Sequence, residues 1–156
     1  MRLHLVTVGT RTPAWVNTGF KEFNKRLPKE FHLNLIEVTP ATRSKSSSIE
    51  KIMAEESKRV RAAIPEGSLI IALDEHGKQM DSQQLSKKLG SWTRDGRDVV
   101  FVIGGADGLA DDIKNSADML WSLSSLTLPH ALVRVVLVEQ IYRAWTIMNN
   151  HPYHRE

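Results

Sequence analysis

The last residues of this chain, Asn150 to Glu156, concentrate side chains that bind nucleotides. Tyr153 has an aromatic face for base stacking, His154 an imidazole that can accept or donate a proton, and Arg155 a guanidinium. Pro152 restricts the preceding residue to extended conformations and can thereby direct the tail. Terminal residues are, however, normally disordered and tolerant of change. We interpret the tail either as part of a nucleotide site or as a solvated end.

Three other candidates lie where buried strands are expected to end. Ligands of open α/β sheets sit outside the carboxyl ends of the strands. One such end is Leu73 and Asp74, and another is Gly104 and Gly105, where a missing side chain permits close approach to the backbone. The third is the segment 123–128. Each also has a purely structural explanation, since glycines after a strand more often form a tight turn than a ligand site.

Motifs for other chemistry are missing from the sequence. The run GGADG lacks the GxGxxG spacing of a dinucleotide-binding loop, and there is no GxxxxGK[ST] phosphate loop. None of the six histidines has HExxH or another metal-ligand spacing, and the chain has no cysteine. The sequence therefore predicts neither a metal site nor thiol chemistry.

Some basic and aromatic residues have two interpretations each. Arg43 and Lys45 lie in the polar stretch 39–48, where they are placed either to contact phosphate or to be solvated. Trp121 and Trp145 fit a hydrophobic core or an interface better than a base-stacking platform.

The elements that must position these residues follow from hydrophobic spacing. Short apolar or alternating runs predict strands, and apolar residues at helical spacing predict helices. The expected strands are residues 3–8, 31–38, 69–73, 99–103 and 119–123. The expected helices are residues 13–27, 49–64, 81–92, 111–117 and 132–147. Strands that alternate with helices predict an α/β fold with a mostly parallel sheet, covered by helices on both faces.

The expected helix 132–147 contains several β-branched valines, which favour strands. Its length decides for a helix, because it far exceeds a typical strand, and Pro129 suits a helix start. On this helix, Arg134, Glu139 and Arg143 are expected to share one polar side.

Composition sets broader limits. A chain of 156 residues suits one domain, residues 1–156, and its 41% hydrophobic and 25% charged residues predict a packed core. The N-terminus has no signal-peptide pattern, no apolar run is long enough to cross a membrane, and the lack of cysteine fits the cytoplasm. A net charge of +3 permits a polyanionic partner without requiring one.

The C-terminal third closely resembles the RlmH family of ribosomal RNA methyltransferases, which belongs to the SPOUT superfamily. The resemblance rests on VFVIGGADGL and on WSLSSLTLPHALVRVVLVEQIYRAWTIMNNHPYHRE, with LVTVGT, TGFKEF and the LD pair agreeing upstream. The LTLPH junction and the YRAW and NHPYHR segments are its most specific parts, and it covers essentially the whole chain. It implies a SPOUT fold, a parallel α/β sheet whose C-terminal part is threaded into a trefoil knot. Hydrophobic spacing would never suggest a knot.

The resemblance implies a homodimeric, metal-free enzyme. It would use S-adenosylmethionine to methylate N3 of pseudouridine 1915 in the 23S rRNA of the assembled ribosome. It also implies a cofactor pocket at the three strand ends described above, where an apolar slot and backbone hydrogen bonds suit an adenine. The residues it assigns to that pocket are Leu73, Gly104, Gly105, Leu123, Ser124, Ser125, Leu126, Thr127 and Leu128.

The reaction implied by the resemblance needs a proton acceptor. The nitrogen that attacks the cofactor's methyl group carries a proton in the neutral base, so a general base or a field that favours the anion is required. We expect His154 to be that base or to position it, and Tyr153 and Arg155 to orient the nucleotide. Arg134 and Arg143 are expected to hold phosphate or the partner subunit.

Two other functions fit the residues before the resemblance is considered. One is a non-catalytic RNA-binding module, which affinity for S-adenosylmethionine would distinguish. The other is a small NAD-dependent oxidoreductase, against which the incomplete glycine spacing argues.

Overall fold

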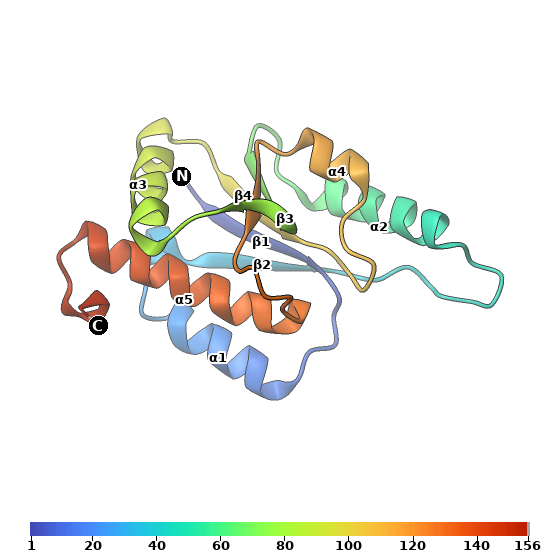
Figure 1. Cartoon of the computed structure of the whole chain (residues 1–156), viewed down its shortest axis with the longest axis horizontal. Helices are drawn as coiled ribbons and strands as arrows, with labels where there is room; N and C mark the ends of the chain where they lie inside the picture. Colours follow the sequence, from blue (N-terminus) through green and yellow to red (C-terminus); the bar gives the residue numbers. More distant parts are fainter. Residues whose placement is uncertain (156) are drawn as a thin grey trace.

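Five parallel strands form the sheet of the computed structural model, which describes residues 1–155 (Figure 1). The strands are β1 (Leu3–Val8), β2 (Leu33–Val38), β3 (Leu69–Gln79), β4 (Val99–Ile103) and β5 (Met119–Ser122). Their order across the sheet is β2-β1-β4-β3-β5. Since all neighbours are parallel, the carboxyl ends of the strands meet at one edge of the sheet.

Helices cover both faces of this sheet, which confirms the predicted α/β architecture. The helices are α1 (Ala14–Asn24), α2 (Ile49–Ala63), α3 (Ser82–Asp95), α4 (Asp111–Ser116) and α5 (His130–Met148), with 3-10 turns at Lys29–Phe31 and Pro152–His154. Helices α1, α3 and α5 pack on one face, with α5 between the other two, and α2 and α4 pack on the opposite face.

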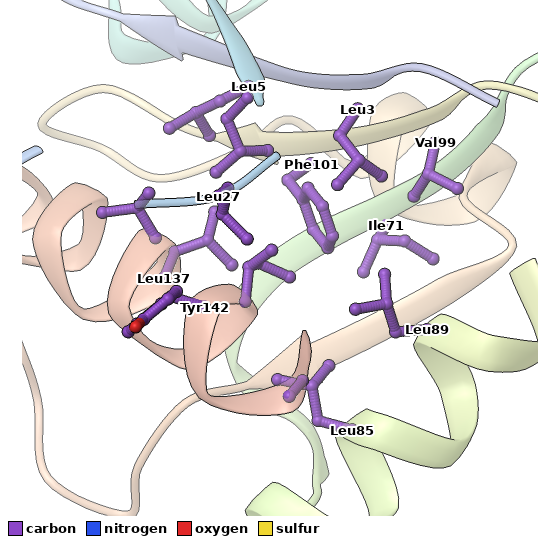
Figure 2. Packing of buried hydrophobic residues seen from close by; sticks show 14 of the residues in the cluster. Leu3, Leu5, Leu27, Ile71, Leu85, Leu89, Val99, Phe101, Leu137 and Tyr142 are labelled. Carbon is purple, nitrogen blue, oxygen red and sulfur yellow. The ribbon is translucent and has the colours of Figure 1, made fainter. Parts of the chain in front are cut away.

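Alternation along the central strands divides the core into two layers. Leu3 and Phe101 point toward α3 and α5, as Figure 2 shows, where they meet Leu137 and Leu89. Val102, next to Phe101 in the chain, points instead to the layer under α2 and α4. This two-residue period explains why β1 and β4 are buried along their whole length.

Helix α5 confirms the helical prediction for its segment, although its valines favour strands. Sheet, α1 and α3 surround most of the helix, and this packing outweighs intrinsic propensity. The predicted polar side was wrong, however. Arg134 precedes Arg143 by nine residues, which is about 180° around a helix, and only Glu139 and Arg143 form a pair.

Three strands differ from their predicted bounds, and the smallest difference is that β5 ends at Ser122 rather than at residue 123. β2 begins at Leu33 rather than residue 31, because the segment after Pro28 forms a 3-10 turn. β3 continues beyond Leu73 to Gln79, with a shift of register in between where Trp121 faces both halves. Gly77 allows this irregularity, since a Cβ there would lie 2.6 Å from the carbonyl carbon of Leu120.

Candidate active site

A cavity of about 430 Å³ opens at the carboxyl edge of the sheet, where β4 and β5 end beside the irregular part of β3 that follows Leu73. Its size lies within the range of cofactor sites, roughly 300–1,000 Å³. The predicted cofactor residues border it, with the exception of Ser125, which does not line the cavity: Leu73, Gly104, Gly105, Leu123, Ser124, Leu126, Thr127 and Leu128. Three segments that are distant in sequence therefore surround one space, as the parallel topology requires.

The turn after β4 forms one wall of the cavity. The backbone N–H of Gly108 donates to the carbonyl of Gly105 (3.0 Å), and Gly108 has a φ of +79°. A Cβ on Gly104 would lie 2.4 Å from the carbonyl carbon of Gly108. The missing side chain of Gly104 thus accommodates the chain's own turn. Gly104 also lines the cavity, and its role in admitting a ligand stays a prediction.

A buried carboxylate, which the sequence did not single out, lies next to this turn. Glu56 of α2 accepts a hydrogen bond from the backbone N–H of Ala41 (3.1 Å). One of its oxygens lies only 3.0 Å from the position of a Cβ on Gly105. On the sequence, Glu56 looks like any other charged residue of an exposed helix, so no pattern marked it.

The loop 39–48 is attached to the same turn. The guanidinium of Arg43 pairs with the carboxylate of Asp107, so Arg43 has a protein partner rather than a free charge. Lys45 is exposed. No residue of this loop lines the cavity, although Arg43 contacts the lining residue Asp107, and phosphate contact by the loop stays a prediction.

The loop after β5 forms the opposite wall. Ser122 donates to the carbonyl of Ser124 (2.8 Å), and the hydroxyl of Ser124 accepts from the backbone N–H of Leu126 (2.9 Å). These local bonds satisfy the serine side chains and leave the Leu126 side chain 73% exposed. Trp121, just before the loop, is a core residue, as its sequence context indicated.

The C-terminal tail is folded against the far end of α5. The Tyr153 hydroxyl donates to the carboxylate of Glu139 (3.0 Å), and its ring packs 4.7 Å from that of Tyr142. Arg143 lies over the Tyr153 ring, 5.0 Å from its centroid, and also binds Glu139. Burial, reinforced by the Glu139 carboxylate, raises the pKa of the Tyr153 phenol above its ordinary value. The phenol is thus a neutral hydrogen-bond donor at pH 7.

His154 is anchored as well. Its Nδ1 lies 3.3 Å from the hydroxyl of Thr146, and the backbone N–H of His151 donates to the carbonyl of Thr146 (2.9 Å). Arg155 is exposed. His151, Tyr153 and His154 therefore hold residues 151–154 against α5, and this part of the tail is not a solvated end.

One chain does not bring the tail to the cavity. Val133 lines the cavity near the start of α5, and Thr146 follows thirteen residues later, about 20 Å along a helix. Figure 1 shows the C-terminus at the end of α5 away from the loops after β4 and β5. The predicted catalytic and cofactor residues thus occupy two separate regions of the molecule.

Arg134 is a structural cation. Its side chain is 2% exposed and binds the Glu37 carboxylate (3.1 Å) and the carbonyl of Gly9 (3.0 Å), so it links α5 to β1 and β2. The expectation that Arg134 holds phosphate is therefore wrong, because its guanidinium is buried among protein groups, out of reach of a ligand in solvent.

Residues 1–155 contain no cluster of three histidine, cysteine, aspartate or glutamate side chains that could hold a metal ion. Over the same residues, no helix combines the length and apolar character needed to cross a bilayer.

Comparison with known proteins indicates which reaction the site carries out. A family described as "Predicted SPOUT methyltransferase" matches residues 1–154. Proteins named ribosomal RNA large subunit methyltransferase H from Paraburkholderia phymatum and Herminiimonas arsenicoxydans are 54% and 55% identical, over 99% of both chains in each case.

Solved structures agree at the level of the fold. A probable methyltransferase from Bordetella pertussis Tohama I has a TM-score of 0.59 at 15% identity, covering 92% of this chain and 95% of that one. A probable methylase family protein from Haemophilus influenzae Rd KW20 gives 0.58 at 12% identity, with 97% and 69% coverage.

Fold, cavity and family match together define a SPOUT methyltransferase, an enzyme that takes its methyl group from S-adenosylmethionine. The chain belongs to the ribosomal RNA large subunit methyltransferase H family. The alternatives of a non-catalytic module and of an oxidoreductase are therefore wrong. The trefoil knot is implied by this membership.

Proposed function

We propose that this protein is a cytoplasmic enzyme that methylates N3 of pseudouridine 1915 in the 23S rRNA of the assembled ribosome. The observation that carries the proposal is full-length identity of 52–55% with enzymes named for the ribosomal RNA large subunit. Identity at this level over 99% of both chains makes a shared substrate the simplest expectation. A pI near 9.3 suits a polyanionic partner.

The cavity at the carboxyl edge suits S-adenosylmethionine. Leu73, Ile103 and Leu128 offer an apolar slot, and the backbone of residues 123–128 offers donors and acceptors for an adenine edge. The bound cofactor supplies a methyl group activated by a sulfonium. The cavity walls, among them residues 123–128, would hold the cofactor and so fix the position of this group for the attacking nitrogen.

A homodimer would unite the cavity with the tail. Leu132 and Val136 lie on the outward side of α5, half-buried and outside both core layers, and Leu126 is largely exposed beside the cavity. These apolar residues fit an interface around α5. Since no residue of 150–155 lines the cavity of its own chain, we assign the tail to the cavity of the second copy.

In that arrangement the tail supplies the groups that handle the base. His154 accepts the N3 proton or orients the group that does, and its contact with Thr146 fixes the ring. Tyr153 presents a neutral phenol held by Glu139 and Arg143, and Arg155 contacts phosphate.

Complementation between two inactive variants tests this assignment. Thr127→Trp fills the cavity from an exposed position, and His154→Ala removes the imidazole. Neither homodimer should methylate ribosomes, whereas co-refolded mixtures should recover roughly a quarter of wild-type activity, because half of the dimers then contain one intact site. Mass mapping of the methylated nucleoside identifies the product. No recovery in mixed dimers would place the tail in its own chain's site, and methylation at another nucleoside would refute the proposed substrate.

A further inference from the structure

One ion pair inside the cavity is not used by any role described so far. Asp74, at the bulge of β3, and Lys114, on α4, face each other with 3.4 Å between Oδ2 and Nζ. Both line the cavity, and their side chains are only 12% and 29% exposed. The pair therefore sits in the wall of a ligand site rather than on the outer surface.

The other charged side chains around the cavity either form an ion pair elsewhere or are largely exposed to solvent. Asp107 pairs with Arg43. Glu75 is 57% exposed and lies beside the still more exposed His76. Among the lining residues, all of them within the described range, Lys114 is the one lysine or arginine. Asp74 and Lys114 are thus the enclosed pair of opposite charges available to a ligand.

We propose that Asp74 and Lys114 form the subsite for the amino-acid end of S-adenosylmethionine. That end is a zwitterion, with an ammonium and a carboxylate on the same carbon. The ligand carboxylate binds the Lys114 ammonium, and the ligand ammonium binds the Asp74 carboxylate. The ion pair between Asp74 and Lys114 holds both charges in place before the ligand binds. Binding replaces this one charge-assisted contact with two, one from each side chain to the ligand. The inference rests on the proposed cofactor cavity.

Ligand analogues isolate each contact in a binding measurement without catalysis. Decarboxylated S-adenosylmethionine lacks only the carboxylate, and 5′-methylthioadenosine lacks the whole amino-acid end. By calorimetry, Lys114→Met should weaken S-adenosylmethionine about tenfold, ~1.4 kcal/mol, and leave both analogues unchanged or tighter. Asp74→Asn should weaken S-adenosylmethionine and its decarboxylated form, but not methylthioadenosine. Lys87→Met, which removes an exposed lysine of α3, is the matched control and should change none of the three.

A merely structural role gives a different result. If the pair only attaches α4 to β3, Lys114→Met weakens all three ligands by a similar factor and lowers the melting temperature. That outcome overturns the inference, as does an unchanged ratio between the affinities of S-adenosylmethionine and its decarboxylated form. Should Lys114→Met fail to fold, Asp74→Asn and the charge-conserving Lys114→Arg decide, the latter being expected to keep the wild-type ratio.

The cavity itself is tested by a separate variant. Thr127→Trp should abolish binding of all three ligands, because it fills the space on which every one of them depends. Normal binding in Thr127→Trp would refute the proposed cavity. Loss of binding there, with an unchanged ligand ratio in Lys114→Met, would refute only the role of the ion pair.

Discussion

The two ends of α5 are built in opposite ways. At its first turns, near Val133, lies a cavity walled largely by backbone, glycines and small or apolar side chains. Along its second half, from Glu139 onward, lies a cluster of aromatic and charged side chains, Tyr142, Glu139, Arg143 and Tyr153, which contact one another. One end can hold a ligand and the other can handle protons, and a methyltransferase needs both.

Among the variants considered, loss of the tail should reduce methylation the most. Deleting residues 153–156, or changing His154→Ala alone, should lower single-turnover methylation of ribosomes by about 10²–10⁴-fold, the usual contribution of a general base. The affinity for S-adenosylmethionine should hardly change, because the cavity lies at the other end of α5. Full activity of the truncated protein would exclude a catalytic tail, and an equal loss of cofactor binding would give the tail a structural role.

Gly104→Ala should disrupt the cavity by a clash with the protein backbone and not by a clash with the ligand. The added methyl group meets the Gly108 backbone, so the turn must move, and we expect a loss of about 1–3 kcal/mol in unfolding free energy, typical of overpacking. Cofactor affinity should fall at least tenfold, measured by calorimetry beside a denaturation curve.

Gly90→Ala provides the matched control for that experiment. A Cβ there makes only an ordinary 3.6 Å contact with the Arg94 side chain, within helix α3. It should stabilise the protein by roughly 0.5–1 kcal/mol and leave cofactor binding intact. Wild-type stability and affinity in Gly104→Ala would contradict the tight contact between Gly104 and Gly108.

Val136→Glu should dissociate the proposed dimer, so that the cavity of one chain no longer meets the tail of the other. A charge on the outward side of α5 opposes an apolar interface, so light scattering should give a mass near the 17.6 kDa of one chain instead of twice that value. Methylation should be lost while the melting temperature changes little, because Val136 is not part of either core layer. A wild-type protein that is itself monomeric at micromolar concentration would contradict the dimer.

Tyr153→Phe should give the smallest effect. It removes one partly buried hydrogen bond to Glu139, worth about 1 kcal/mol, and should slow methylation only a few-fold because the ring remains. The folded-state pKa of Tyr153 is raised, so the hydroxyl stabilises the protein fully below its ordinary pKa of about 10, and this stabilisation is lost as the pH rises through the raised value. The stability difference between wild type and Tyr153→Phe should therefore shrink in alkaline solution. A constant difference up to pH 11 would contradict this.

Much of the fold was predictable because local patterns determine it. The bounds of β1 and β4 match the prediction residue for residue, since short apolar runs between turn residues have few alternatives in a parallel sheet. The extension of β3 beyond Leu73 was not predictable. It depends on β5, some forty residues later, and on the contact between Gly77 and Leu120.

By itself, the sequence determined the order of the elements, the strand ends that could bind a ligand and, through its resemblance, the family. Only the tertiary structure decided which partner each polar side chain binds and whether that side chain lines the cavity. Arg134 and Arg143 look equivalent on the helix, yet one is sealed beneath β1 and β2 and the other supports Tyr153. Lys114 and Asp74 are forty residues apart, and nothing in their local sequence pairs them. Such contacts arise from the packing of distant segments, which hydrophobic spacing does not encode.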